Sequence, residues 1–81
     1  MDISLAGFKN IATNVMFDAY SVCFALADGR NISAPLSWFP RLMNATGKER
    51  DNWQLIGQGS GVRWPDINED ISIPGLLGLP D

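Results

Sequence analysis

Histidine is missing from this 81-residue chain, and cysteine occurs once, as Cys23. Without histidine, the Ser-His and Cys-His pairs of nucleophilic enzymes and the usual zinc sites are excluded. A single cysteine excludes an internal disulfide, and this usage is typical of a reducing cytosol. Cys23 lies in an alternating apolar run, so we expect a buried structural thiol rather than a reactive one.

Long apolar runs and an excess of basic residues are also missing. No apolar run approaches the length of a membrane span, and the N-terminus lacks the basic start of a signal peptide. The chain carries 6 Lys and Arg against 9 Asp and Glu, a net charge of −3. This balance disfavours direct binding of nucleic acid, since such proteins usually present a basic face. We expect a soluble, cytoplasmic protein that contacts no membrane.

The composition is that of one small folded domain. A hydrophobic content of 46%, with three Trp and four Phe, is enough for a core and excludes disorder. Residues 1–10 are weakly patterned and are interpreted as an N-terminal arm. Residues 11–78 are interpreted as a single domain, and residues 79–81 as a tail.

The first half of the domain predicts three strands. Residues 11–17 alternate apolar and polar side chains, the period of a half-buried strand. Residues 22–26 are nearly apolar on both faces, which predicts a central strand covered on both sides. Asp28-Gly29 is a strong turn signal, since both residues tolerate the positive φ of hairpin turns. Residues 30–36 follow as a third strand, at an edge because of Pro35.

Two short helical pieces are predicted next, over residues 38–44 and 47–52. Ser37 can cap the first, and Pro40 is acceptable because it falls in the first turn. The second begins with Thr46-Gly47-Lys48-Glu49, the form of a capping box. The break between the two pieces is expected near Asn44-Ala45.

The remaining chain predicts two more strands and a final extended segment. Strands are expected from Trp53 to Gly57 and over 62–64, a turn or a short 3₁₀ piece over 65–70, and an extended segment over 71–73. The fold class that follows is α+β, a small antiparallel β-meander packed against one or two short helices.

The segment Gly57-Gln58-Gly59-Ser60-Gly61 is unusual because its glycines alternate. Glycine lets the backbone bend sharply or run close to another segment. A dinucleotide-binding pattern would need glycine at Val62, and no P-loop Lys-Ser follows. No nucleophile elbow can be built around Ser60 either. A glycine-hinged hairpin or bulge is therefore the prediction.

The segment Asp66-Ile67-Asn68-Glu69-Asp70 begins like a calcium loop. Such a loop next needs a glycine and, at its twelfth position, a bidentate Glu, and here Ile71 and Leu77 stand in those places. We therefore predict no metal at this segment and no cofactor. Either the carboxylates cap a turn, with Arg63 as an ion partner, or they form a surface for a basic partner.

The three tryptophans are expected to differ in exposure. Core packing is predicted for Trp38 and Trp64, and partial exposure for Trp53 at the end of a helical piece. A stacking platform for bases would need flanking basic residues. The basic residues of this part of the chain are too scattered to form a patch: Arg41, Lys48, Arg50 and Arg63.

Several short motifs occur in an order that resembles the bacterial domain of unknown function 2442 family. They include D-G-R from Asp28, W-F-P-R-L from Trp38, A-T followed by Arg50, W-P at Trp64, and E-D-I from Glu69. The resemblance covers roughly residues 11–78 and implies a small α+β domain with no established activity. The family commonly has an acidic residue where Asn68 stands here, which weakens any role that needs three carboxylates.

The resemblance also bears on partners. Related genes often lie beside genes for the domain of unknown function 4160 family, and some relatives carry an appended helix-turn-helix. This implies a toxin–antitoxin-like or paired regulatory role. The present chain has no room for a helix-turn-helix after the core, so DNA binding is not carried over.

The resulting functional hypothesis is a non-enzymatic protein-binding module, such as an antitoxin-like or regulatory subunit. The partner would be another protein, one candidate being a small protein encoded by a neighbouring gene, and a homo-oligomer is left open. Alternatives are a nucleic-acid-associated regulator, or a sensor of a small ligand or metal that uses the glycine and acidic stretches. The residues predicted to bind the partner are Arg50, Trp53, Trp64, Asp66, Glu69 and Asp70.

Overall fold

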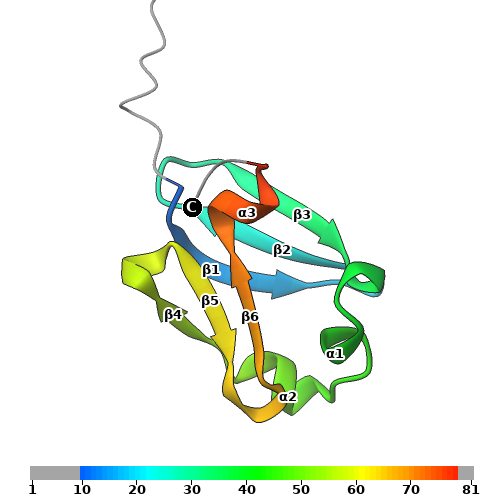
Figure 1. The fold of residues 1–81 in the computed structure, drawn as a ribbon. Helices are drawn as coiled ribbons and strands as arrows, with labels where there is room; N and C mark the ends of the chain where they lie inside the picture. The colour runs from blue at the N-terminus through cyan, green and yellow to red at the C-terminus, as the bar shows by residue number, and fades with distance from the viewer. Residues whose placement is uncertain (1–9, 79–81) are drawn as a thin grey trace, which may run out of the picture.

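Two three-stranded antiparallel sheets make up most of the protein (Figure 1). The computed structural model describes residues 10–78, so the predicted arm, apart from Asn10, and the tail lie outside the described residues. The strands of the first sheet, in the order β1-β2-β3, are Ala12–Phe17, Ser21–Leu26 and Asn31–Pro35. Those of the second, in the order β4-β5-β6, are Gln54–Ile56, Gly61–Trp64 and Glu69–Ser72. The α+β class is confirmed, and the meander is divided between two sheets.

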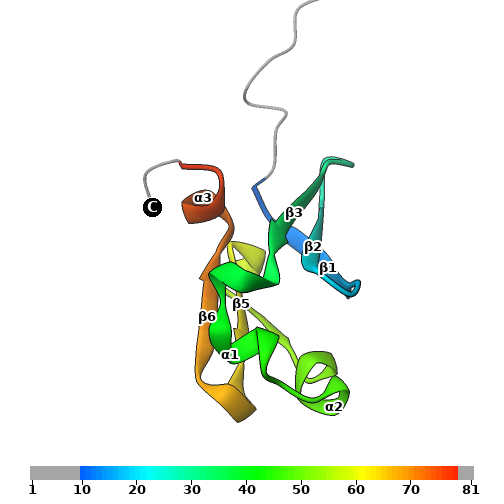
Figure 2. The same cartoon turned by 90° about the vertical axis from the view of Figure 1, so that its right-hand side faces the viewer.

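Short helices connect and follow the sheets. They are α1 (Pro40–Met43), α2 (Gly47–Asp51) and α3 (Ile73–Leu76), with 3₁₀ turns η2 (Leu36–Trp38), η3 (Gly57–Gly59) and η4 (Pro65–Ile67). Figure 2 shows the two sheets as two layers, with α1 and α2 in the connection between them. Among the described residues, no helix is long and apolar enough to cross a membrane.

The predicted break and capping box in this connection are confirmed. The first piece begins at Pro40 rather than Trp38, because proline, which lacks an N–H, suits the first position of a helix. The Thr46 hydroxyl accepts a hydrogen bond from the Glu49 N–H at 3.1 Å, and the Glu49 carboxylate accepts one from the Thr46 N–H at 2.9 Å. The two bonds satisfy donors that a helix start leaves unpaired.

The core lies between the inner faces of the two sheets. Trp64 of β5 is fully buried and meets Phe17 and Phe24 edge-on, with ring centroids 6.2 and 6.4 Å apart. Aromatic pairs favour this edge-to-face arrangement. The buried apolar residues are Ala12, Val15, Val22, Phe24, Leu26, Ala34, Leu36, Leu42, Val62, Trp64, Ile71 and Ile73.

Strand β2 is central in its sheet, as predicted, but it is covered on one side only. Val22, Phe24 and Leu26 point into the core, whereas Ser21, Cys23 and Ala25 are partly exposed on the opposite face. The expectation of a buried thiol at Cys23 is therefore wrong. Its physical reason is that α1 and α2 lie in the connection between the sheets, so within residues 10–78 no further layer covers this face.

The expected burial of Trp38 is also wrong. Its side chain is 64% exposed, while Leu36 and Leu42 on either side fill the core. The 3₁₀ turn η2 directs Leu36 inward, and Trp38, two residues later, lies outside. Trp53 is partly buried against the core, which confirms its predicted intermediate exposure.

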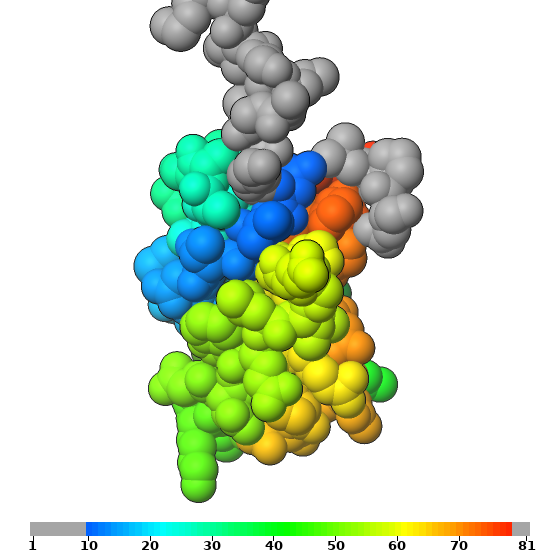
Figure 3. Space-filling view, turned by 90° about the vertical axis from the view of Figure 1, so that its left-hand side faces the viewer, coloured from blue at the N-terminus to red at the C-terminus, as the bar shows by residue number. Residues whose placement is uncertain are grey.

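The glycine stretch forms a tight connection between β4 and β5. Gly59 is buried at a φ of +94°, and a Cβ built there would meet Ile11 and Ala12, where β1 begins. Figure 3 shows this stretch, in yellow, against the start of β1, in blue. The predicted glycine-hinged hairpin is confirmed, because β4 and β5 pair antiparallel on either side of this stretch.

Candidate functional site

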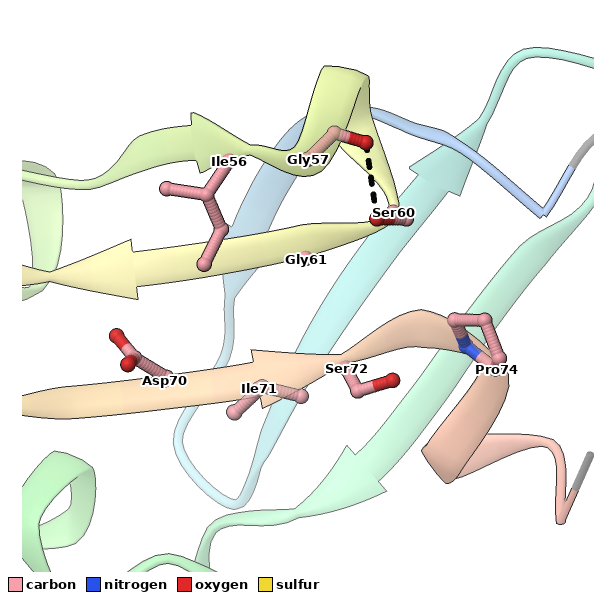
Figure 4. A pocket seen from close by; sticks show the side chains of 8 residues that line it. All are labelled: Ile56, Gly57, Ser60, Gly61, Asp70, Ile71, Ser72 and Pro74. Carbon is pink, nitrogen blue, oxygen red and sulfur yellow. Dashed lines mark hydrogen bonds between the residues drawn. The ribbon is translucent and has the colours of Figure 1, made fainter. Parts of the chain in front are cut away.

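The outer face of the second sheet carries a hollow of about 430 Å³ beside Gly61 (Figure 4). Gly61 lies in the central strand, opposite Ile56 of β4 on one side and Ser72 of β6 on the other. The Ile56 side chain leans over Gly61, and its Cγ1 is 3.1 Å from the place of a Cβ. Because glycine leaves that place empty, Ile56 can lie against the sheet and form an apolar wall. The residues that line the hollow are Ile56, Gly57, Ser60, Gly61, Asp70, Ile71, Ser72 and Pro74.

The two hydroxyls of this hollow are held by their own turns. The Ser60 hydroxyl donates to the carbonyl of Gly57 at 2.9 Å, and the Ser72 hydroxyl accepts from the Gly75 N–H at 3.1 Å. These bonds fix the turn after β4 and the start of α3. The hydroxyls thus shape the wall of the hollow.

Among residues 10–78, Asp70 is the only charged residue that lines the hollow. Its side chain is 54% exposed, and a carboxylate oxygen lies 3.7 Å from Nη1 of Arg63 on the neighbouring strand. Exposed pairs at such distances contribute little to stability, because water screens them and two long side chains must be held in place. The Asp70 carboxylate therefore remains accessible to a cation from outside.

The other predicted acidic residues serve different contacts. Strand register places Glu69 beside Trp64 and Asp70 beside Arg63, so the two carboxylates leave β6 on opposite faces. Asp66 accepts a hydrogen bond from the Asn52 side chain at 3.0 Å, which ties η4 to the end of α2. Only Asp70 of the three reaches the hollow. No group of three or more His, Cys, Asp or Glu among residues 10–78 is arranged to hold a metal ion.

Arg50 is engaged in holding the fold together. Its guanidinium donates from Nε to the carbonyl of Leu42 and from Nη2 to that of Met43, both at 3.0 Å. It also lies 5.5 Å from the centre of the Phe17 ring. The carbonyls at the end of α1 have no partner within the helix, so a cation there is stabilising.

Trp64 must be removed from the set of predicted partner-binding residues. Its ring is fully buried, and its indole N–H donates to the carbonyl of Arg50 at 3.0 Å. A side chain without exposed surface contacts nothing outside the chain. Arg50 of α2 thus contacts both sheets, through Trp64 of β5 and through Phe17 of β1.

Comparison with known proteins identifies the family. The family model described as "Protein of unknown function (DUF2442)" matches residues 12–79. The chain belongs to this family. A crystal structure of a protein of unknown function from Rhodospirillum rubrum is similar, with 26% sequence identity and a TM-score of 0.70 over 85% of this chain and 87% of that one. No curated protein matches.

For this member of the DUF2442 family, sequence reasoning missed two walls of the hollow, Ile56 and Pro74. Ile56 is 37% exposed, which is unusual for a large apolar side chain in a strand next to a core. Its importance depends on its position opposite Gly61, and that register joins residues from two strands. The signal in the sequence was a large apolar residue, Ile56, directly before the glycine stretch.

One carboxyl group far from the hollow has a clearly perturbed pKa. Hydrogen bonds from the Tyr20 N–H, the Ser21 hydroxyl and the Ser21 N–H lower the pKa of Asp18 below its ordinary value of 3.8. The two N–H bonds to Oδ1 measure 2.8 and 2.7 Å. They fix the tight reversal between β1 and β2, so Asp18 acts as a turn residue.

Proposed function

We propose that this chain is a non-enzymatic protein-binding module whose hollow beside Gly61 receives an apolar side chain of a partner protein. A Lys or Arg of the same partner would lie against Asp70. The observation that carries the proposal is an apolar depression bordered by one exposed carboxylate. Such a combination supplies a desolvated anchor point together with a charge that sets orientation.

The charge of the surrounding chain favours a basic partner. From Trp64 to Gly78 the described residues include three carboxylates, Asp66, Glu69 and Asp70, and no basic residue. Arg63 beside Asp70, and Arg41, which donates to the carbonyl of Asn68, offset part of this charge. The remaining excess of carboxylates favours the approach of a basic surface over that of phosphates. This supports a protein partner over nucleic acid.

The burial pattern supports a role without catalysis. None of the buried side chains among residues 10–78 is polar or charged. General acid–base catalysis uses groups whose pKa is moved by burial or by close charges within a cleft. Of the described residues that line the hollow, only Asp70 is ionisable in this way, and it is exposed beside Arg63.

The partner of this module would be a small cytoplasmic protein, and one encoded by a neighbouring gene is the first candidate. The module would then act as an antitoxin-like or regulatory subunit without a cofactor. A small-ligand sensor is the second candidate function, since a hollow of about 430 Å³ lies within the size range of ligand pockets.

The test is quantitative capture of proteins from the native host by the wild type and by single variants. Asp70→Lys should reduce recovery of the partner, whereas Asp51→Lys, an equal charge change at an exposed position of α2, should preserve it. Ile56→Ser should reduce recovery more than Leu55→Ser on the same strand. Melting temperatures identify any variant that fails to fold.

Salt dependence gives the second measurement. With the captured partner purified, binding to the wild type should weaken as salt rises, and binding to Asp70→Lys should show a smaller slope. If every captured protein binds Asp70→Lys and Ile56→Ser as well as it binds the two controls, the hollow is not the binding site. If the wild type instead captures a small molecule from the host, and Asp70→Lys and Ile56→Ser do not, the sensor function is favoured.

A further inference from the structure

The described chain begins next to the hollow of the second sheet. Ile11 lies against the glycine stretch, because a Cβ built at Gly59 would overlap its Cγ2. Ser60, the residue after Gly59, lines the hollow. Figure 3 shows the same neighbourhood, with the glycine stretch in yellow against the start of the described chain in blue. Residues 1–9 therefore join the protein beside one rim of the hollow.

The point at which residues 1–9 join is fixed by hydrogen bonds. Nη2 of Arg30 donates to the side-chain oxygen of Asn10 at 2.6 Å. The carbonyl of Ile11 accepts from the N–H of Ala27 at 2.9 Å. Because both bonds tie the chain to the end of the first hairpin, the segment before Asn10 starts from a defined position relative to the hollow.

The length of this segment is sufficient to cross the hollow. Nine extended residues span up to about 30 Å. The second sheet measures about 10 Å between its outer strands, from a strand spacing of about 4.8 Å. Leu5 precedes Asn10 by five residues and can lie up to about 17 Å from it. The middle of the hollow is therefore within reach of Leu5, and the rim near Ser60 within reach of Phe8.

The composition of the segment suits an apolar wall. Residues 3–8 read Ile-Ser-Leu-Ala-Gly-Phe, with three large apolar side chains and no charge. Apolar side chains gain free energy when they leave water. The hollow offers Ile56 and Pro74 as apolar surface, and Gly57 and Gly61 leave room beside the strands because they have no Cβ.

Two other hollows lie farther from the start of the described chain. Both are bordered by Tyr20. Strand β1 runs from Ala12 to Phe17, so Tyr20 lies at the opposite end of the first sheet from Asn10. Of these three hollows, the one beside Gly61 is thus the nearest to the point where residues 1–9 join.

We propose that residues 1–9 turn back over the outer face of the second sheet and place Leu5 in the hollow beside Gly61. Because the segment belongs to the same molecule, its effective concentration is on the order of millimolar. An intrinsic dissociation constant of about 1 mM would then fill the hollow about half of the time. A contact too small to hold a separate peptide therefore suffices for a tethered one.

Paramagnetic relaxation enhancement tests this docking in the full chain without a partner. A nitroxide attached at Ser4→Cys, in a Cys23→Ser background, should broaden the amide signals of Gly61 and Ser72. The amide signal of Ser21, at the far end of the first sheet, should keep its intensity. The same sample with the nitroxide reduced is the reference, and it also shows whether the fold is intact.

The matched control carries the same label together with Leu5→Ser and Phe8→Ser. A tether that does not dock broadens the signals near its attachment equally in both proteins. Docking through apolar side chains predicts that the broadening at Gly61 falls by about half or more in the control, because the hollow is then vacated. Equal broadening in the two proteins would overturn the proposal.

A mixing experiment identifies the molecule that supplies the segment. Isotope-labelled protein without nitroxide is combined with spin-labelled protein that carries no isotope. No broadening at Gly61 is expected in the mixture, since the segment docks on its own chain. Broadening there would overturn the proposal, because another copy would then be the source. These measurements contain no partner, so their outcome is separate from whether a partner protein binds the hollow.

Discussion

Replacing Gly59 with alanine probes the contact that joins the glycine stretch to the first sheet. A Cβ at Gly59 would overlap Cγ2 of Ile11 and stand 3.0 Å from the carbonyl oxygen of Ala12. Ile11 could change its side-chain rotamer. The Ala12 backbone is less free to move, because β1 is paired with β2 through Leu26.

The magnitude follows from two separate terms. A residue with a Cβ at the positive φ of Gly59 costs about 1–2 kcal/mol. Forcing extra volume into a packed position adds about 1–3 kcal/mol. The expected loss of about 2–5 kcal/mol is a large share of the total stability of roughly 4–12 kcal/mol for a chain of this length. The melting temperature should fall by at least about 10 °C.

Gly29 provides the matched control. It also has a φ of +94°, but a Cβ built there would meet nothing within 4 Å. Gly29→Ala should therefore lose only the conformational term, about 1–2 kcal/mol. Urea unfolding followed by tryptophan fluorescence measures both variants, since Trp64 is buried. Equal losses for the two variants would refute the close contact between the glycine stretch and β1.

Four further outcomes are expected. Phe24→Ala should destabilise the fold by about 3–5 kcal/mol in thermal melts, and a shift of a degree or two would show that Phe24 is not core. Thr46→Ala should lose about 0.5–2 kcal/mol by urea unfolding, through the capping box. Because the pKa of Asp18 is lowered in the folded protein, its carboxylate stabilises the fold above pH 3.8, and this stabilisation is lost as the pH falls through the pKa of the folded state. The melting temperatures of wild type and Asp18→Ala should therefore differ at pH 7 and converge in strong acid. Calorimetric titration with calcium should give no binding at Asp66, and micromolar binding that Asp66→Asn abolishes would contradict this.

Local signals predicted most of the elements correctly. The alternation of residues 11–17 identified a strand, because successive side chains of a strand point to opposite faces. The capping box at Thr46 was predictable because its two hydrogen bonds join residues three apart. The sharp turn at Gly29 likewise depends on its own φ.

Exposure was harder to predict, because it depends on what lies across from a residue. Cys23 and Ala25 are apolar enough for a covered face, yet the chain supplies no layer over them within residues 10–78. Trp38 is an equal candidate for the core by type, but Leu36 and Leu42 occupy that space. These outcomes are decided by tertiary packing and are not contained in any window of the sequence.

The candidate site shows the same division between local and distant information. The sequence treats Glu69 and Asp70 as one acidic patch, whereas their position in β6 sends the two carboxylates to opposite faces of the sheet. One is placed beside the buried Trp64 and the other beside Arg63 at the hollow. The register of β6 thus decides which of these acidic residues lies at the edge of the core and which lies on the surface. In this fold the register leaves Asp70 as the carboxylate exposed at the hollow, next to the Ile56 side chain, which can lie against the sheet because the opposing strand residue is a glycine.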